Sequence, residues 1–351
     1  MYPDWIGLDC TGPSQTHRDA ALVRQQQLTK PLGALGRLET IAVELAALQA
    51  TDTPGADCVP VVLFAGDHGI AAQGVSAYPA EVTVQMLRNF ASGGAAISVL
   101  SRTLGVPLEV VDAGTLAAEA IPGVIVDKPR NGTRDFSREP ALIAAEVVFA
   151  LDAGRHAIAR QMGLKPQLVI LGEMGIGNTT SAAAIAAALL PCAPSEIVGS
   201  GTGLDGEGRA RKARVISDAL VLHGLGSGAP VEVVLPAVGG LEIIAMTGAI
   251  VAAAQARLPI LIDGFIVSVA ALAASRLNPS CRPWLIFSHR SAERGHGLVL
   301  DALGARPLID LDLRLGEASG AATALPILRL ACALHNGMAT FAEAAVSNRD
   351  A

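Results

Sequence analysis

The sequence predicts an α/β fold in which a mostly parallel, Rossmann-like sheet is flanked by helices. Hydrophobic residues fill 51% of the 351 positions but aromatic residues only 3%, and this composition suits helices packed closely on a sheet better than a β-sandwich. Short apolar runs that end in Gly or Asp alternate with Ala-rich segments of helical length. The repeating strand–loop–helix unit implies parallel strands joined by right-handed crossovers.

The apolar runs from about Cys58 onward are interpreted as buried strands, each followed by a functional loop. We expect roughly six or seven strands in the sheet. In open parallel sheets ligands bind beyond the carboxyl ends of the strands, where the Gly, Asp, Glu and His residues of this chain accumulate. The runs are VPVVLFAGDHG, PLEVVDAGT, PQLVILGEMGIGN, VEVVLPAVGG, LPILIDGF, RPWLIFSHRS and RPLIDLDLRLGEASG.

Both ends of the chain have helical patterns. Apolar residues recur near helix spacing from Ser14 to Ala50, interrupted by the break KPLGALG, and the chain is helical again after Gly320. We expect residues 1–55 and 322–351 to form one small helical domain together. Residues 56–321 would then form a large α/β domain.

Composition and charge argue against several other classes of protein. The net charge of −6, without any run of Lys or Arg, gives little attraction for nucleic acid. The mean hydropathy is +0.45, but no stretch of roughly 20 apolar residues is free of charges, so no membrane span is expected. The N-terminal sequence MYPDWIGLDC lacks the basic flank and apolar run of a secretory signal. We therefore expect a soluble, cytoplasmic protein.

The cysteines are odd in number, widely scattered and never in a C-x-x-C pair. This pattern argues against a disulfide framework or a zinc site, so they are interpreted as inert core residues. They are Cys10, Cys58, Cys192, Cys281 and Cys332.

A glycine-rich turn in LGEMGIGNTTSAAAIAAALL is the first candidate phosphate site. An apolar strand ends near Leu171, and a helix is expected to begin at Asn178, Thr179 or Thr180. Free backbone amides at a helix start attract anions, and hydroxyl groups add donors. The alternative is ordinary N-capping after a tight turn. Glu173 favours a functional turn, because a carboxylate at the strand end would face the crevice.

The segment VGSGTGLDGEGRARKARVI contains the spacing G-x-G-x-x-G at Gly201, Gly203 and Gly206, which is normally a dinucleotide fingerprint. The match is weak, because the preceding strand would be very short and no clear second strand ends in an acidic residue about twenty positions later. The following helix carries several cations, most of which we expect to be solvated. One lysine above a phosphate-binding loop would add a point charge that backbone amides lack. These cations are Arg209, Arg211, Lys212 and Arg214.

A third motif, RLGEASGAATALP, places Glu317 between Gly316 and Gly320 after an alternating apolar run. A carboxyl group in a partly apolar loop has its pKa raised, which suits a general base working near neutral pH. The alternative is a capping or solvated glutamate, since strand-to-helix loops often carry an acidic residue near a helix start.

A fourth segment begins with FAGDHG, which places Asp67 and His68 at a strand end, and continues through Tyr78, Gln85 and Met86. Met and aromatic side chains offer polarizable faces to a flat heterocycle, and Gln can fix its orientation. The alternative for Met86 is a plain core position. No further His or Cys stands at metal-ligand spacing and no G-x-S-x-G occurs, so we reject metalloenzyme and hydrolase interpretations.

Seven blocks of sequence, which include these motifs, occur in a fixed order from Lys30 to the C-terminal helices. They are KPLGALGRLE, FAGDHGIAAQGVSAYPAEVTVQM, LGEMGIGNTTSAAA, GTGLDGEGRARK, LIDGFI, FSHRSAERGH and LRLGEASGAA. Together they closely resemble the nicotinate-nucleotide–dimethylbenzimidazole phosphoribosyltransferase family. A single glycine loop would be weak evidence, whereas the ordered set covers nearly the whole chain and is specific.

The resemblance implies a homodimer that transfers the 5-phosphoribosyl group from nicotinate mononucleotide to 5,6-dimethylbenzimidazole or a related base. The products would be alpha-ribazole 5'-phosphate and nicotinate, in assembly of the cobalamin nucleotide loop, with no metal or cofactor. Glu317 would be the general base, and Glu173 would position the base or the ribose hydroxyls. The implied phosphate-binding residues are Gly175, Gly177, Asn178, Thr179, Gly201, Thr202, Gly203 and Lys212, and the implied base-binding residues are Ser76, Tyr78, Gln85, Met86 and Leu315.

Two other functions stay open at this point. The Gly201–Gly206 spacing would suit an oxidoreductase that binds NAD, and a carrier of the same fold would bind a benzimidazole without releasing nicotinate. Retention of Glu317 argues against the carrier. Arg290 and Arg294 in SHRSAERGH either contact a substrate carboxylate or phosphate or are surface charges, and we favour the surface because exposed arginine is more common.

Overall fold

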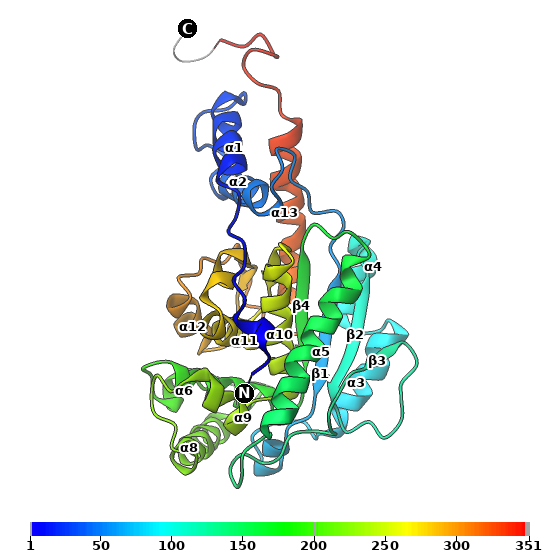
Figure 1. Cartoon of the computed structure of the whole chain (residues 1–351), viewed down its shortest axis with the longest axis vertical. Helices are drawn as coiled ribbons and strands as arrows, with labels where there is room; N and C mark the ends of the chain where they lie inside the picture. The colour runs from blue at the N-terminus through cyan, green and yellow to red at the C-terminus, as the bar shows by residue number, and fades with distance from the viewer. Residues whose placement is uncertain (1, 200, 202, 348–351) are drawn as a thin grey trace.

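A six-stranded sheet with every strand parallel lies at the centre of the molecule (Figure 1). The structure is a computed structural model that describes residues 2–199, 201 and 203–347. The strand order β3-β2-β1-β4-β5-β6 is that of a doubly wound Rossmann sheet, in which the winding reverses between β1 and β4. The predicted fold class is confirmed. The strands are β1 (Val61–Gly66), β2 (Leu108–Gly114), β3 (Val124–Val126), β4 (Val169–Met174), β5 (Ile260–Ile262) and β6 (Leu285–Phe287).

Two long helices, α5 (Ala144–Met162) and α10 (Leu241–Gln255), pack against each other and against the central strands. Glycine makes the close approach possible, because a Cβ atom at Gly154 of α5 or at Gly248 of α10 would overlap the backbone of the facing helix. The other helices are η1 (Asp4–Gly7), η2 (Gly69–Gln73), α3 (Glu81–Ser92), α4 (Ala96–Leu104), α6 (Asn178–Leu189), α7 (Pro194–Ile197), α8 (Gly206–Leu222), α11 (Phe265–Leu277), η3 (Pro279–Trp284) and α12 (His296–Ala302).

Helices from the two ends of the chain lie side by side and project from the body that holds the sheet (Figure 1). They are α1 (Gln15–Gln27), α2 (Arg37–Gln49) and α13 (Ser319–Gly337), and α2 packs against both of the others. The Arg24 guanidinium donates a hydrogen bond of 2.7 Å to the carbonyl oxygen of His335, and a backbone bridge joins Leu28 to Thr340. The helical pattern predicted at both ends is therefore confirmed.

Two of the predicted strands are wrong. The run VEVVLPAVGG forms a helix, α9 (Val231–Val238), in which Val234 and Val238 are buried one helical turn apart. A short apolar run fits a buried helix and a buried strand equally well, and periodicity alone does not separate them. The run RPLIDLDLRL contributes only β8 (Ile309–Asp310), which pairs in parallel with β7 (His289–Arg290) outside the main sheet.

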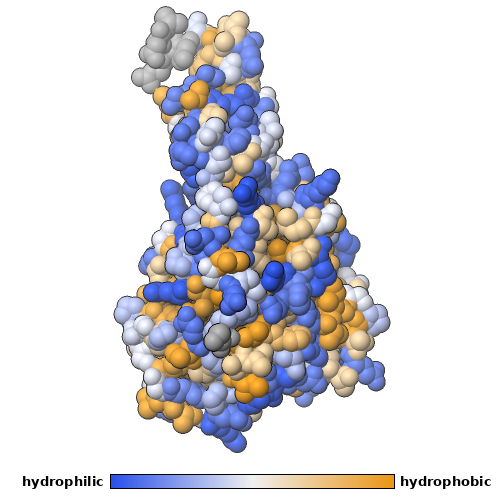
Figure 2. Space-filling view, in the orientation of Figure 1, coloured by the Kyte–Doolittle hydropathy of each residue, from blue (hydrophilic) through white to orange (hydrophobic). Residues whose placement is uncertain are grey.

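The edge strand β3 (Val124–Val126) is not among the predicted strands, because its apolar run is only three residues long, whereas β5 and β6 lie within longer apolar runs. None of the helices that the structure describes is long and apolar enough to cross a membrane. Hydrophilic and hydrophobic residues are interspersed on the face shown in Figure 2. The free cysteines are buried at Cys10, Cys281 and Cys332 and half-buried at the other two positions.

Candidate active site

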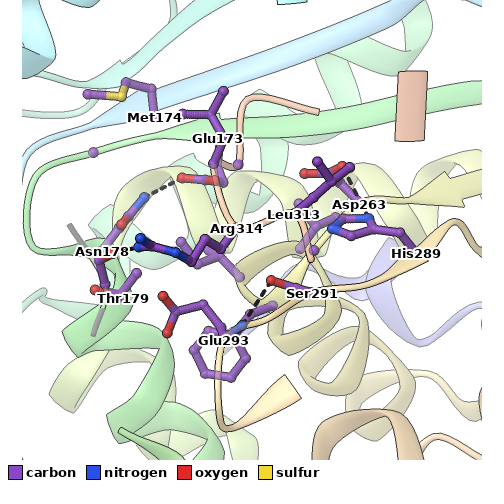
Figure 3. Close-up of a pocket in the computed structure, with 18 of the residues that line it drawn as sticks. Glu173, Met174, Asn178, Thr179, Asp263, His289, Ser291, Glu293, Leu313 and Arg314 are labelled. Carbon is purple, nitrogen blue, oxygen red and sulfur yellow. Dashed lines mark hydrogen bonds and ion pairs between the residues drawn. The ribbon is translucent and has the colours of Figure 1, made fainter. Parts of the chain in front are cut away.

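A cavity of about 510 Å³ opens at the carboxyl ends of β4 and β5. Glu173 lies near the end of β4, and Asp263 directly follows β5. In Figure 3, Glu173 lies above Asn178 on one side of the cavity and Asp263 lies beside His289 on the other. The cavity thus lies beyond the strand ends, where the sequence predicts the site.

The glycine turn predicted to bind phosphate has the expected form. Gly177 is the N-cap of α6 and has a φ angle of +95°, a left-handed conformation that favours glycine. α6 begins at Asn178, within the predicted range, and Asn178 and Thr179 both line the cavity. A Cβ atom at Gly175 would overlap the carbonyl oxygen of Gly66, so the turn lies directly against the end of β1. The start of α6 therefore presents its amide end to the cavity.

Lys212 is the one buried cation among the four predicted near the start of α8. Its Nζ atom donates a hydrogen bond of 2.6 Å to Oγ1 of Thr179. Burial lowers the pKa of Lys212 to about 8, and the nearby carboxylate of Glu293 partly opposes this shift. Lys212 therefore stays mainly protonated at pH 7 and places a positive charge beside the glycine turn.

The second glycine segment meets the same point of the cavity wall. A Cβ atom at Gly201 would lie 3.0 Å from Oγ1 of Thr179 and 3.3 Å from Nζ of Lys212. Gly203 is exposed and does not line the cavity, and Thr202 lies outside the described residues. Between α7 and α8 the described residues include no strand, so the G-x-G-x-x-G spacing does not form a dinucleotide fingerprint.

Glu173 is buried among other acidic groups. The Asn178 side-chain amide donates a hydrogen bond to Oε2 of Glu173. Burial, followed by the charges of Asp263, Glu242 and Glu317, raises the pKa of Glu173 to about 8. At pH 7 this carboxyl group is mainly protonated, so it can donate as well as accept a hydrogen bond.

Glu317 directly follows Gly316, a cavity-lining residue, and is itself buried. Its φ angle is +59°, an unusual conformation for a residue with a side chain. Burial and the charge of Asp263 raise the pKa of Glu317, while a hydrogen bond from the backbone amide of Ile97 opposes the rise. Its Oε2 atom has no hydrogen-bond partner among the described residues. Such a carboxylate is suited to accept a proton.

The two glutamates are neighbours across Gly316. A Cβ atom at Gly316 would overlap Oε1 of Glu173, and one at Gly172 in β4 would lie 2.7 Å from the backbone nitrogen of Ala318. The loop that carries Glu317 therefore packs directly on β4, which carries Glu173. Glu173 lines the cavity, whereas Glu317 does not line it and lies directly behind the lining residue Gly316. Two carboxyl groups with raised pKa values therefore adjoin one end of the cavity.

The residues predicted to bind the base are only partly brought together. Tyr78 and Leu315 line the cavity and are 56% and 60% exposed. The hydroxyl of Ser76 accepts a hydrogen bond of 3.2 Å from the Tyr78 amide, which fixes the loop before α3. Gln85 is exposed on α3 and Met86 packs against the core, and neither lines the cavity.

Several cavity residues were not assigned a role from the sequence. Asp263 accepts a hydrogen bond of 2.8 Å from the Ala321 amide in the first turn of α13 and lies 3.8 Å from Nδ1 of His289. The Arg314 guanidinium donates a hydrogen bond of 3.4 Å to the carbonyl oxygen of Gly201. Asp263 and His289 lie in the blocks LIDGFI and FSHRSAERGH, each just after a predicted strand. That position could have identified them as candidate site residues.

A neutral histidine supports the loop after β7. Nδ1 of His296 accepts a hydrogen bond of 2.8 Å from the Ser291 amide, so Nε2 carries the proton and faces Oγ of Ser268 at 3.0 Å. Burial, and then the charges of His289 and Arg290, lower the pKa of His296 to about 3. Arg290 and Arg294 are exposed and do not line the cavity, in agreement with the surface interpretation.

The fold and the site define an α/β enzyme with a cavity at the strand ends, a glycine turn at a helix start and buried acid–base groups. A family model described as phosphoribosyltransferase matches residues 10–346. The chain belongs to the nicotinate-nucleotide–dimethylbenzimidazole phosphoribosyltransferase family.

Curated relatives of that name match the chain over its full length. The sequence is 78% identical to the protein from Bradyrhizobium sp. (strain BTAi1) over 351 residues, which is 100% of both chains. It is 65% identical to the protein from Bradyrhizobium diazoefficiens, again over 100% of both chains. A crystal structure of the enzyme from Thermus thermophilus superposes with a TM-score of 0.90 at 43% identity, covering 95% of this chain and 99% of that one.

Proposed function

We propose that this protein transfers the 5-phosphoribosyl group from nicotinate mononucleotide to 5,6-dimethylbenzimidazole or a related base. The products are alpha-ribazole 5'-phosphate and nicotinate, in assembly of the cobalamin nucleotide loop. The observation that carries the proposal is the presence of two kinds of group in and directly behind the wall of one cavity. A glycine turn with Lys212 can bind the phosphate, and buried carboxyl groups with raised pKa values stand beside it.

The substrate phosphate binds at the start of α6. The glycines of the turn Gly175–Gly177 supply backbone amides, Thr179 supplies a hydroxyl group, and Lys212 supplies the positive charge. The amides of Ile176 and Asn178 already donate to Oγ1 of Thr83 and to the carbonyl oxygen of Gly175, so Asn178 contributes through its position at the helix start. Gly201 closes the same wall without a side chain. In this position the phosphate anchors the ribose while the glycosidic bond breaks, and the phosphate itself takes no part in bond making.

Glu317 acts as the general base. A ring nitrogen of the benzimidazole attacks the anomeric carbon of the ribose, the bond to nicotinate breaks, and the benzimidazole N–H proton passes to the Glu317 carboxylate. The pyridinium of the substrate becomes neutral as it leaves. The raised pKa of Glu317 brings its basicity towards neutral pH, and its unpartnered Oε2 atom is available for the proton.

Glu173 positions a substrate rather than accepting the proton. With a pKa of about 8 it is mainly protonated at pH 7 and can donate a hydrogen bond to a ribose hydroxyl or to the base. Tyr78 and Leu315 offer apolar surface on which the flat base can lie. Ser76 supports this surface through the Tyr78 loop, whereas Gln85 and Met86 lie outside the cavity lining.

A chromatographic assay tests the function. Purified protein is incubated with nicotinate mononucleotide and dimethylbenzimidazole beside a Glu317→Ala variant. We expect nicotinate and alpha-ribazole 5'-phosphate from the wild type and a loss of about 10²–10⁴-fold in the variant. Tight binding of the base without any product would support a non-catalytic carrier instead.

The organisation of the protein in the cell and in solution is part of the same proposal. The enzyme works in the cytoplasm as a homodimer, and residues 1–55 with 322–351 form a small domain beside the large domain of 56–321. The packing of α2 on both α1 and α13 supports this division, although α13 begins three residues before the boundary, at Ser319. The contacts of η1 do not support it, because η1 packs on α10 of the large domain and Trp5 bonds to Asp152 of α5. Sedimentation of the purified protein would test the dimer.

A further inference from the structure

A histidine–glutamate pair, His68 and Glu242, is buried behind the site and has no role so far beyond the charge of Glu242, which helps to raise the pKa of Glu173. Nε2 of His68 lies 2.7 Å from Oε1 of Glu242, and both side chains are fully shielded from solvent. His68 lies two residues beyond β1, and Glu242 lies in the first turn of α10. Nδ1 of His68 and Oε2 of Glu242 have no hydrogen-bond partner among the described residues.

Burial of such a pair is costly, because the desolvation of two ionisable groups can exceed their mutual attraction. Apolar residues of similar volume often serve stability equally well. The pair is therefore poorly explained by stability alone, and its surroundings indicate what it does.

Glycine residues from several segments close around the pair. A Cβ atom at Gly66, the last residue of β1, would lie 2.6 Å from Oε2 of Glu242, and one at Gly240 would overlap Cε1 of His68. The imidazole also faces the glycine turn. A Cβ atom at Gly175 would lie 3.4 Å from Nε2 of His68, and one at Gly177 would lie 3.2 Å from its Cβ atom. His68 is thus wedged between the start of α10 and the turn.

We propose that Glu242 is a positioning residue that acts through His68 to hold the Gly175–Gly177 turn in its phosphate-binding conformation. The turn leads straight into Asn178, which holds Glu173, and Thr179, which accepts from Lys212. A displacement of the His68 imidazole would therefore move the turn together with Asn178 and Thr179, which form the proposed phosphate site. The inference rests on the proposed function, because it assigns that turn to the substrate phosphate.

The test compares two substitutions at one position. Glu242→Met removes the acceptor for His68 and keeps the side-chain length, whereas Glu242→Gln retains an acceptor oxygen. We expect Glu242→Met to raise both KM and the calorimetric Kd for nicotinate mononucleotide by about ten-fold or more. The KM for dimethylbenzimidazole should stay unchanged, and Glu242→Gln should return both values close to those of the wild type.

A second variant displaces the same imidazole by steric overlap from the N-cap of α10. Gly240→Ala introduces a Cβ atom that overlaps His68, and it should give the same selective rise even if Glu242→Met does not fold. The control is Glu109→Met, which removes an ion pair of 2.8 Å with Arg160 at the amino end of β2, whereas the site lies at the carboxyl ends of the strands. This control should leave both KM values unchanged.

Two results would overturn the inference. One is a wild-type Kd for nicotinate mononucleotide in folded Glu242→Met and Gly240→Ala proteins, and the other is an equal rise of both KM values. If the wild-type protein itself bound no nicotinate mononucleotide, the proposed function would be wrong, and the inference would fail with it. That outcome is distinct from the two above, in which the wild type binds the nucleotide.

Discussion

Nζ of Lys212 in α8 lies 2.6 Å from Oγ1 of Thr179 in α6, so two helices from different parts of the chain meet at one point of the cavity wall. The lysine is buried, whereas the arginines of the same helix segment, Arg209, Arg211 and Arg214, are exposed. A buried cation without a carboxylate in hydrogen-bond contact is costly. A bound phosphate would neutralise the charge of Lys212, so this contact predicts that the lysine binds the substrate phosphate.

Removal of the charge on Lys212 should weaken binding of the nucleotide. A hydrogen bond to a charged group is worth about 1.5–3 kcal/mol, so Lys212→Met should raise KM for nicotinate mononucleotide roughly ten- to hundred-fold. Steady-state kinetics measure the effect. Arg214→Met, an exposed position on the same helix, is the matched control and should have wild-type KM. Equal values for the two variants would contradict the assignment of Lys212.

A methyl group in the glycine turn should damage the site. Gly175→Ala places a Cβ atom on the carbonyl oxygen of Gly66, and such overpacking costs about 1–3 kcal/mol. We expect a lower midpoint of urea unfolding together with a higher KM for nicotinate mononucleotide. Gly206→Ala at the start of α8 meets no atom within 4 Å and should be neutral. Unimpaired kinetics in Gly175→Ala would show that the turn does not bind the substrate.

The buried carboxyl of Glu173 should make stability depend on pH. Its pKa rises from an ordinary 4.5 to about 8 on folding. Between these values the folded protein retains a proton that the unfolded chain has lost. The contribution of Glu173 to the free energy of unfolding is therefore full below pH 4.5 and falls as pH rises towards 8, by at most about 1.4 kcal/mol per pH unit.

Glu173→Gln removes this titration and isolates its contribution. The variant should gain stability relative to the wild type as pH rises from 5 to 7.5, which urea unfolding at both pH values would measure. Other groups titrate in the same way in both proteins, so only the difference between them is informative. A difference that is the same at pH 5 and at pH 7.5 would contradict the raised pKa.

The acceptor side of the cavity should tolerate related bases. Tyr78 and Leu315 are largely exposed and offer apolar contacts, and small changes in an apolar pocket discriminate by only about 1–3 kcal/mol. Benzimidazole and dimethylbenzimidazole should therefore differ in kcat/KM by no more than roughly 200-fold. Competition between the two bases in one reaction measures the ratio. Turnover of a single base alone would contradict this expectation.

Most of the sheet could be predicted because buried parallel strands are continuous apolar runs, as in β1 and β4. The same property explains the error at α9, where an apolar run is buried in a helix. The sequence position of Lys212 indicates burial, although a charged side chain is normally expected to be exposed. It lies four residues before Ile216, on the stripe of α8 that faces the core, so its burial could have been inferred from spacing.

Other features of the site depend on the order of the strands, which local sequence does not reveal. β5 pairs with β4, so Asp263 is brought near Glu173 although ninety residues separate them in the chain. The pair of His68 and Glu242 is likewise joined across 174 positions. Burial of such charged residues becomes visible only when the packing of the helices on the sheet is known.

The most direct test of the account is whether release of nicotinate requires the acceptor base. Purified enzyme is given nicotinate mononucleotide, and dimethylbenzimidazole is added after a delay, while both nicotinate and alpha-ribazole 5'-phosphate are followed by chromatography. Transfer between substrates held in one cavity predicts negligible nicotinate before the addition and equal amounts of the two products after it. Steady release of nicotinate without the base, or no release with it, would contradict the account.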